Sequence, residues 1–103
     1  MNLAEMQKVL VADDDAINRQ VLGELLKPEY TVLLAKNGTQ TLERAQRHVP
    51  DLILLDVVMP DMDGYEVLRR LGGVFRQRGF QCQQRVFGAG IVGAQAGFEL
   101  AQQ

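Results

Sequence analysis

The sequence predicts an α/β protein built on a doubly wound parallel sheet, an incomplete one with about four strand-helix units. Short aliphatic runs stop abruptly at polar residues, as strands buried on both faces of a parallel sheet do. Segments with apolar residues at helical spacing alternate with these runs over short connections, which is typical of βαβ units. The length of 103 residues limits the number of units, because five strand-helix units would need roughly 125 residues.

The first unit begins with KVLVA at residues 8–12, a β-branched run that stops at Asp13 and is predicted to be a strand. Asp15 has the side chain of a good helix N-cap. A helix follows, because apolar residues recur at three- and four-residue steps until Pro28 ends the pattern. The apolar residues of this predicted helix are Ile17, Val21, Leu22, Leu25 and Leu26.

Two further strands follow in the predicted order. The second is YTVLLA at residues 30–35, and the third is LILLD, which ends at Asp56. Between them we expect a turn at Asn37 and Gly38 and a short helix, TQTLERAQRH, with Leu42 and Ala45 facing inward. The predicted sheet therefore has a strand-helix-strand-helix-strand order with right-handed crossovers.

Acidic residues stand at the ends of two of these strands. Asp13 and Asp14 follow the first strand, and Asp56 ends the third. In a flavodoxin-like strand order those two strands are neighbours at the switch point, where ligands bind at the carboxyl ends of the strands. The three carboxylates should therefore converge. Their like charges favour a bound cation, and an oxygen-only ligand set suits Mg²⁺.

Composition narrows the classes of function and location. The chain is 47% hydrophobic and 23% charged, with a net charge of -2. It therefore lacks the excess of positive charge with which proteins bind polyanions, and we expect no nucleic-acid partner. No apolar run approaches the ~20 residues of a membrane span. The N-terminal segment lacks the uninterrupted hydrophobic region of a signal peptide. We therefore expect no membrane association and a cytoplasmic location. A single cysteine, Cys82, excludes an internal disulfide.

Residues 8–71 resemble the receiver domain of two-component response regulators. VLVADDDAINRQVL is similar to the acidic-pair segment of that family, and LAKNGTQTLERAQRHVPDLILLDVVMPDMDGYEVLRRL is similar to its phosphoacceptor segment. The resemblance implies that Asp56 is the phosphoacceptor. It also implies that Asp14 is a direct metal ligand, that Asp13 acts on the metal mainly through water, and that the Val58 carbonyl is a further ligand.

The resemblance further implies Mg²⁺-dependent aspartyl phosphorylation, with a sensor histidine kinase or a phosphotransfer protein as partner. The chain would accept a phosphoryl group and have no separate catalytic domain. A phosphatase with an aspartyl nucleophile would usually place a second acid two residues after it. Val58 stands at that position, which disfavours such an enzyme.

Residues 72–103 depart from the family pattern. Receivers place Thr or Ser at the end of the fourth strand and Lys at the end of the fifth, yet this chain has no serine, its last threonine is Thr41 and its last lysine is Lys36. We therefore expect an impaired readout of phosphorylation. The whole of 1–103 is predicted to be a single receiver-like domain, in which 1–71 matches the family and 72–103 is a divergent or frame-changed tail.

The tail also supports other predictions. One is a fourth strand-helix unit, with a strand at Val86 and Phe87 and then a helix. Its apolar residues at helical spacing are Ile91, Ala94, Phe98 and Ala101. Gly88, Gly90 and Gly93 spell G-x-G-x-x-G, so a dinucleotide-binding fragment is an alternative function, although the chain stops ten residues after Gly93, before the acid that the motif needs about 20 residues on. A non-signalling receiver remnant is another alternative.

Overall fold

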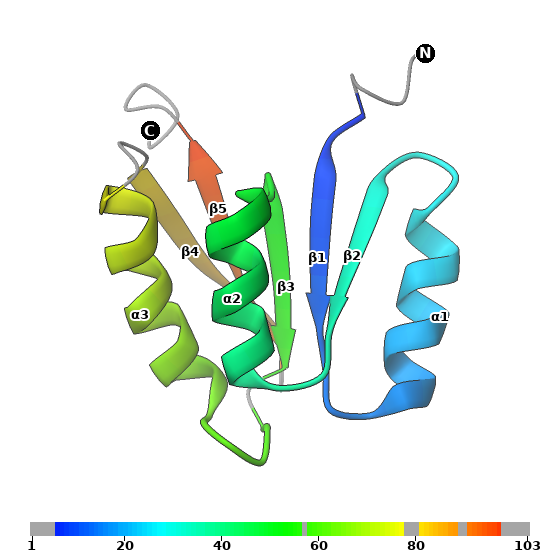
Figure 1. The fold of residues 1–103 in the computed structure, drawn as a ribbon. Coiled ribbons are helices and arrows are strands. Elements are labelled where there is room, and N and C mark those ends of the chain that lie inside the picture. Colours follow the sequence, from blue (N-terminus) through cyan, green and yellow to red (C-terminus); the bar gives the residue numbers. More distant parts are fainter. Residues whose placement is uncertain (1–5, 57, 78–80, 89–90, 98–103) are drawn as a thin grey trace.

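The computed structural model describes residues 6–56, 58–77, 81–88 and 91–97. They form one five-stranded sheet flanked by helices (Figure 1). The strands are β1 (Lys8–Ala12), β2 (Thr31–Ala35), β3 (Leu52–Asp56), β4 (Gln81–Gly88) and β5 (Ile91–Gly97). The helices are α1 (Ala16–Leu26), α2 (Gly38–His48) and α3 (Gly64–Gln77).

The strand order in the sheet is β2-β1-β3-β5-β4. β1 lies between β2 and β3 and pairs with both in parallel, with Ala12 beside Ala35 on one side and beside Leu55 on the other. This arrangement confirms the predicted flavodoxin-like doubly wound class for the first three strands. It also confirms that the first and third strands along the chain are neighbours.

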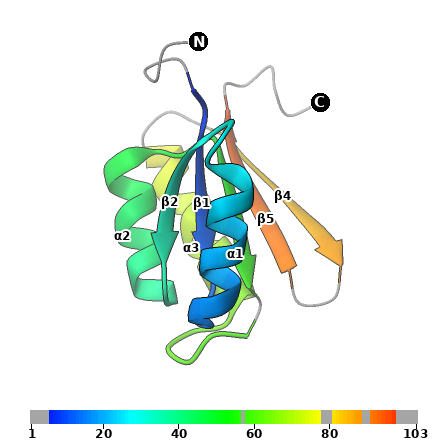
Figure 2. The same ribbon diagram turned by 90° about the vertical axis from the view of Figure 1, so that its right-hand side faces the viewer.

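Helices lie on both faces of the sheet, α2 and α3 on one and α1 on the other (Figures 1 and 2). The core lies under α2 and α3, because the cluster of buried apolar residues draws on β1, β2, β3, α2 and α3 and on no residue of α1. Leu10, Ile53 and Phe75 are each 0% exposed. By contrast, α1 has no buried residue, and Ile17 and Leu25 are more than two-thirds exposed.

The predicted fourth strand-helix unit is wrong. Val86 and Phe87 do lie in a strand, β4, but Ile91 and Ala94 lie in a second strand, β5, and not in a helix. β5 pairs antiparallel with both β3 and β4, so these two strands form a hairpin added to the parallel sheet. Glycine and β-branched residues in IVGAQAG lower its helix propensity, and pairing with β3 and β4 stabilises it as a strand. Phe98 and Ala101 lie outside the described residues.

One predicted turn is part of a helix in the structure, and another helix runs past the change in composition after Leu71. Asn37 and Gly38 do not form a free turn, because Asn37 is the N-cap of α2 and accepts a hydrogen bond from Gln40 N (2.8 Å), and Gly38 is the first helical residue. The helix α3 runs through the glycines after Leu71 and buries Phe75 before it ends at Gln77. The change in composition after Leu71 therefore does not coincide with the end of an element.

In the described part of the chain, the helices are too short and too polar for any of them to cross a membrane.

Candidate functional site

Asp13, Asp14 and Asp56 lie together at the carboxyl ends of β1 and β3. Each side chain offers a carboxylate oxygen, and these oxygens lie within 4.8 Å of one another. The cause is the parallel pairing of β1 with β3, which places Ala12 beside Leu55, so that the residues following both strands leave the sheet at one edge. The predicted convergence of the three carboxylates is confirmed.

Local hydrogen bonds hold Asp13 in place. Its N–H donates to the carbonyl of Ala35 (3.1 Å), and its carbonyl accepts from Arg19 Nη1 (2.7 Å). Its carboxylate Oδ1 accepts from the N–H of Asp15 (2.9 Å). Asp15 in turn caps α1 as predicted, since its Oδ1 accepts from Ile17 N (2.8 Å). The turn from β1 into α1 thus orients one member of the acidic cluster.

The cluster is electrostatically unfavourable by itself. Partial burial raises the pKa of Asp13 above its usual range, and the nearby charges of Asp56 and Asp14 raise it further, against the lowering effect of the Asp15 N–H. In the part of the chain that the structure describes, none of the three carboxylates forms an ion pair. Three converging carboxylates fit a hard divalent cation such as Mg²⁺.

Val58 lies beside Asp56 at the start of the segment that joins β3 to α3. Its N–H donates to Asp56 Oδ1 (3.1 Å), and its side chain is 72% exposed. The hydrogen bond restrains the carboxylate that the resemblance identifies as the phosphoacceptor. The carbonyl of Val58 belongs to the same short segment, so it can contribute a neutral oxygen to the site.

Sequence reasoning missed Asp61, which connects the segment after β3 to α2. Its carboxylate accepts four hydrogen bonds, from Gly38 N (2.8 Å), Thr39 N (2.9 Å), Thr39 Oγ1 (2.8 Å) and Met62 N (3.0 Å). Burial raises the pKa of Asp61, but these hydrogen bonds outweigh it and lower that pKa to about 2. The only signal in the sequence is the pair of acids in MPDMDG, Asp61 and Asp63. Asp63 does cap α3, through Glu66 N (2.8 Å).

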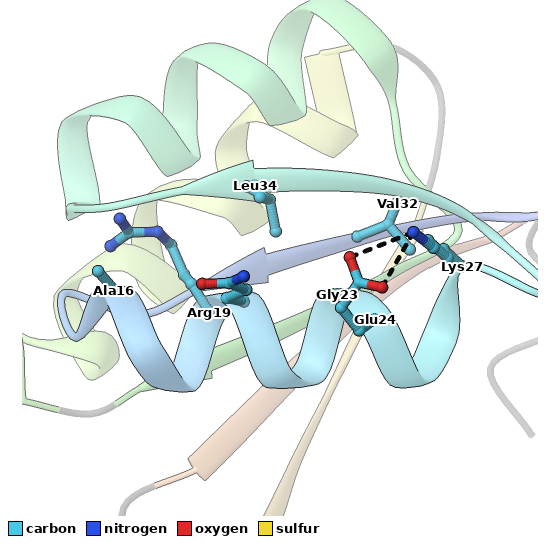
Figure 3. A pocket seen from close by; sticks show the side chains of 8 residues that line it. Ala16, Arg19, Gly23, Glu24, Lys27, Val32 and Leu34 are labelled. Carbon is cyan, nitrogen blue, oxygen red and sulfur yellow. Dashed lines mark hydrogen bonds and ion pairs between the residues drawn. The ribbon is translucent and has the colours of Figure 1, made fainter.

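A small apolar pocket of about 210 Å³ adjoins the acidic cluster and is lined by Asp13, Asp56, Leu22 and residues of β1 and β3. A larger pocket of about 460 Å³ lies between α1 and β2 (Figure 3). Arg19, Glu24 and Lys27 of α1 contribute its charged groups, and Glu24 and Lys27 form an ion pair (2.9 Å). The larger pocket contains none of the three clustered acids, so it is not part of the candidate site.

The glycine motif of the tail does not have the geometry of a dinucleotide site. Such a motif requires a strand, a tight turn and a helix. Gly88 ends β4, and Gly93 lies inside β5, where it pairs with Leu54 and Arg85. Gly90 lies outside the described residues. Because a strand stands where the helix should begin, the structure contradicts the dinucleotide-binding alternative.

Comparison with known proteins points to one family. The family model for the response regulator receiver domain matches residues 9–79. Sporulation initiation phosphotransferase F of Bacillus subtilis is 41% identical over 66 residues, which are 63% of this chain and 53% of that protein. The chemotaxis protein CheY of Bacillus subtilis is 36% identical over 66 residues, which are 62% of this chain and 55% of that protein.

Solved structures give the same result. The N-terminal domain of a response regulator receiver protein from Methanoculleus marisnigri has a TM-score of 0.60 and 37% identity, over 62% of this chain and 53% of that one. A receiver domain from Saccharomyces cerevisiae, co-crystallised with a histidine phosphotransfer signaling protein, gives a TM-score of 0.66 and 28% identity, over 72% of this chain and 52% of that one. The chain thus spans about half the length of these relatives.

Proposed function

The chain belongs to the response regulator receiver domain family, and on that premise we propose that it is a phosphoacceptor in a histidine-to-aspartate relay, with Asp56 as the residue phosphorylated. The observation that carries this proposal is the cluster of Asp13, Asp14 and Asp56 at the adjacent carboxyl ends of β1 and β3. An open α/β sheet binds its ligands at this edge. The family relationship and the position of the cluster support the same role.

In the proposed reaction, a carboxylate oxygen of Asp56 attacks the phosphorus of a phosphohistidine or of a small phosphodonor. A new O–P bond forms as the donor's bond to phosphorus breaks, the bonding electrons leave with the donor group, and Asp56 becomes an acyl phosphate. The Val58 N–H, which donates to Asp56 Oδ1, restrains the carboxylate in one orientation. Such positioning is a large part of what a protein contributes to phosphoryl transfer.

The Mg²⁺ ion would be held by Asp13, Asp14, Asp56 and the Val58 carbonyl. Asp14 would be a direct ligand, and Asp13 would act mainly through water. When bound, the ion would neutralise negative charge on the transferring phosphoryl oxygens. The residues present fit this role, because they form an oxygen-only set in which Asp13 carries a raised pKa from burial and like charge. Without a cation, the same carboxylates would repel an anionic phosphodonor.

We propose that the response to phosphorylation is weak. Receivers read the phosphoryl group through a hydroxyl and an ammonium from neighbouring strands. Here β5, the neighbour of β3 on the side away from β1, runs antiparallel to it, and Ile91, which has neither group, occupies the position beside Asp56. Thr41 is buried in α2, where its hydroxyl donates to the Asn37 carbonyl (2.7 Å). A ligand shifts an equilibrium only through contacts that differ between the two states, and these differential contacts are missing from the described residues.

The proposed partner is a sensor histidine kinase or a phosphotransfer protein, and the proposed compartment is the cytoplasm. The co-crystallised yeast receiver supports this class of partner, since it binds a histidine phosphotransfer protein. The test is transfer from a phosphotransfer protein labelled on its histidine. The label should move to the parent chain and not to Asp56→Asn. A chain that receives no label from any of several donors would instead be a non-signalling remnant of the family.

A further inference from the structure

We propose that Asp61 is a positioning residue for the acidic site: it ties the segment between β3 and α3 to the start of α2 and so holds the Val58 carbonyl where a metal ion needs it. This inference rests on the proposed function. The hydrogen bonds of Asp61 span 22 and 23 residues of sequence, to Thr39 and Gly38. They therefore join two separate connections of the sheet.

Asp61 and Asn37 accept from different N–H groups at the start of α2. The Asn37 side chain accepts from Gln40 N (2.8 Å), whereas Asp61 accepts from Gly38 N and Thr39 N. Asn37 is the local cap, and Asp61 reaches the helix from a distant segment. The Asp61 carboxylate therefore completes the cap of α2 and at the same time fixes the segment after β3 to that helix.

This segment packs closely against α2 at Gly38. A side chain at Gly38 would overlap Met62 and lie 3.0 Å from Val67 Cγ2. In the same contact, the Gly38 N–H donates to Asp61 at 2.8 Å. Close packing and three hydrogen bonds thus fix Asp61 against α2.

Asp61 is three residues from Val58, and the two residues between them transmit the restraint. Met59 is buried in the core at 7% exposure, and Pro60 has a fixed φ angle. The segment is then anchored at the β3 end by the Val58–Asp56 hydrogen bond and at the other end by Asp61. Without the second anchor, Val58 would sample more conformations and would have to be ordered again whenever a metal binds.

Groups that orient metal ligands from behind typically change metal affinity by about 10- to 100-fold when removed. We expect Asp61→Ala to raise the Mg²⁺ dissociation constant about 10-fold, near the lower limit, because Val58 would be only one of several ligands. The maximal phosphorylation rate at saturating Mg²⁺ should stay near that of the parent. Asp61→Asn keeps one acceptor oxygen and should lie between the parent and Asp61→Ala.

The matched control is Asp51→Ala. Asp51 also accepts a backbone hydrogen bond, from Lys8 N (2.7 Å). It precedes β3, however, and so lies at the amino end of that strand, away from the acidic cluster at the carboxyl end. Its loss should lower thermal stability and leave the Mg²⁺ dissociation constant unchanged. In metal-free protein, amide hydrogen exchange at Val58 and Met59 should be faster in Asp61→Ala than in the parent, and unchanged in Asp51→Ala.

The experiment is an NMR titration of Mg²⁺ alone into the parent and the three variants, followed by phosphorylation at several Mg²⁺ concentrations. A parental dissociation constant in Asp61→Ala would overturn the inference, and so would an equal loss of affinity in Asp51→Ala. If the parent is phosphorylated on Asp56 while Asp61→Ala matches it at every Mg²⁺ concentration, this inference alone fails. If the parent neither binds Mg²⁺ nor accepts a phosphoryl group, the proposed function fails with it.

Discussion

Replacing Asp13 by Asn should stabilise the metal-free protein. The side chain is partly buried, and carboxylate oxygens of Asp14 and Asp56 lie within 4.8 Å. Two unit charges at that distance repel by roughly 0.9 kcal/mol at the dielectric constant of water and by roughly 3.5 kcal/mol at a dielectric constant of 20. Asn keeps the Oδ1 acceptor for the Asp15 N–H, so the change removes charge without removing that hydrogen bond.

Because Asp14 is exposed, we use the lower figure and expect a gain of about 1 kcal/mol, or a melting temperature about 4–8 °C higher. The pKa of Asp13 is raised in the folded state, so the fold disfavours its charged form. That penalty is absent below the unfolded pKa of about 3.9 and complete above the folded value. The advantage of Asn should therefore be largest at neutral pH and vanish on acidification below about pH 4.

The assay is thermal unfolding followed by circular dichroism, with EDTA and then with Mg²⁺. In the parent, Mg²⁺ at ten times its dissociation constant should add about 1.4 kcal/mol of stability, whereas Asp13→Asn should gain clearly less. The variant should thus be more stable than the parent in EDTA and less responsive to metal. A lower melting temperature in EDTA, or an undiminished Mg²⁺ response, would show that the carboxylates do not form the repulsive, metal-binding cluster inferred from their positions.

Three further predictions follow from the fold and the loop contacts. Phe75→Ala should lower the free energy of unfolding by about 3–5 kcal/mol in urea titrations, because it empties a fully buried position of α3. Leu25→Lys should change that free energy by no more than about 0.5 kcal/mol, since this side chain of α1 is 71% exposed. The pKa of Asp61 is lowered to about 2, so the stability difference between the parent and Asp61→Asn should be complete above about pH 4 and shrink as the pH falls through 2; a difference independent of pH would contradict that assignment.

The parallel part of the fold was predictable because its signals are local. LILLD and KVLVA are apolar runs ended by an acid, and the doubly wound strand order then brings Asp13 and Asp56 together without any knowledge of side-chain packing. The N-cap at Asp15 was predictable for the same reason, since a cap contacts its own helix. The resulting acidic cluster needed only strand ends and strand order.

The features that sequence reasoning missed depend on partners far away in the chain. The hydrogen bond from Gly38 N to Asp61 joins residues 23 positions apart in the sequence. In the sequence alone, Asp61 indicates only a turn. In the tail, the apolar spacing of IVGAQAG is compatible with a helix, but pairing with β3 and β4 stabilises this segment as a strand. The exposure of Val21 and Leu25 in α1 also depends on what covers that helix, which periodicity does not reveal.

The most direct test of the proposed function is intact-mass spectrometry of the parent and Asp56→Asn after incubation with acetyl phosphate and Mg²⁺. We expect one added phosphoryl group of about 80 Da on the parent, located at Asp56 by peptide mapping after borohydride reduction of the acyl phosphate, and none on Asp56→Asn or on the parent in EDTA. A phosphoryl group on another residue, or equal modification of Asp56→Asn, would contradict the proposed function.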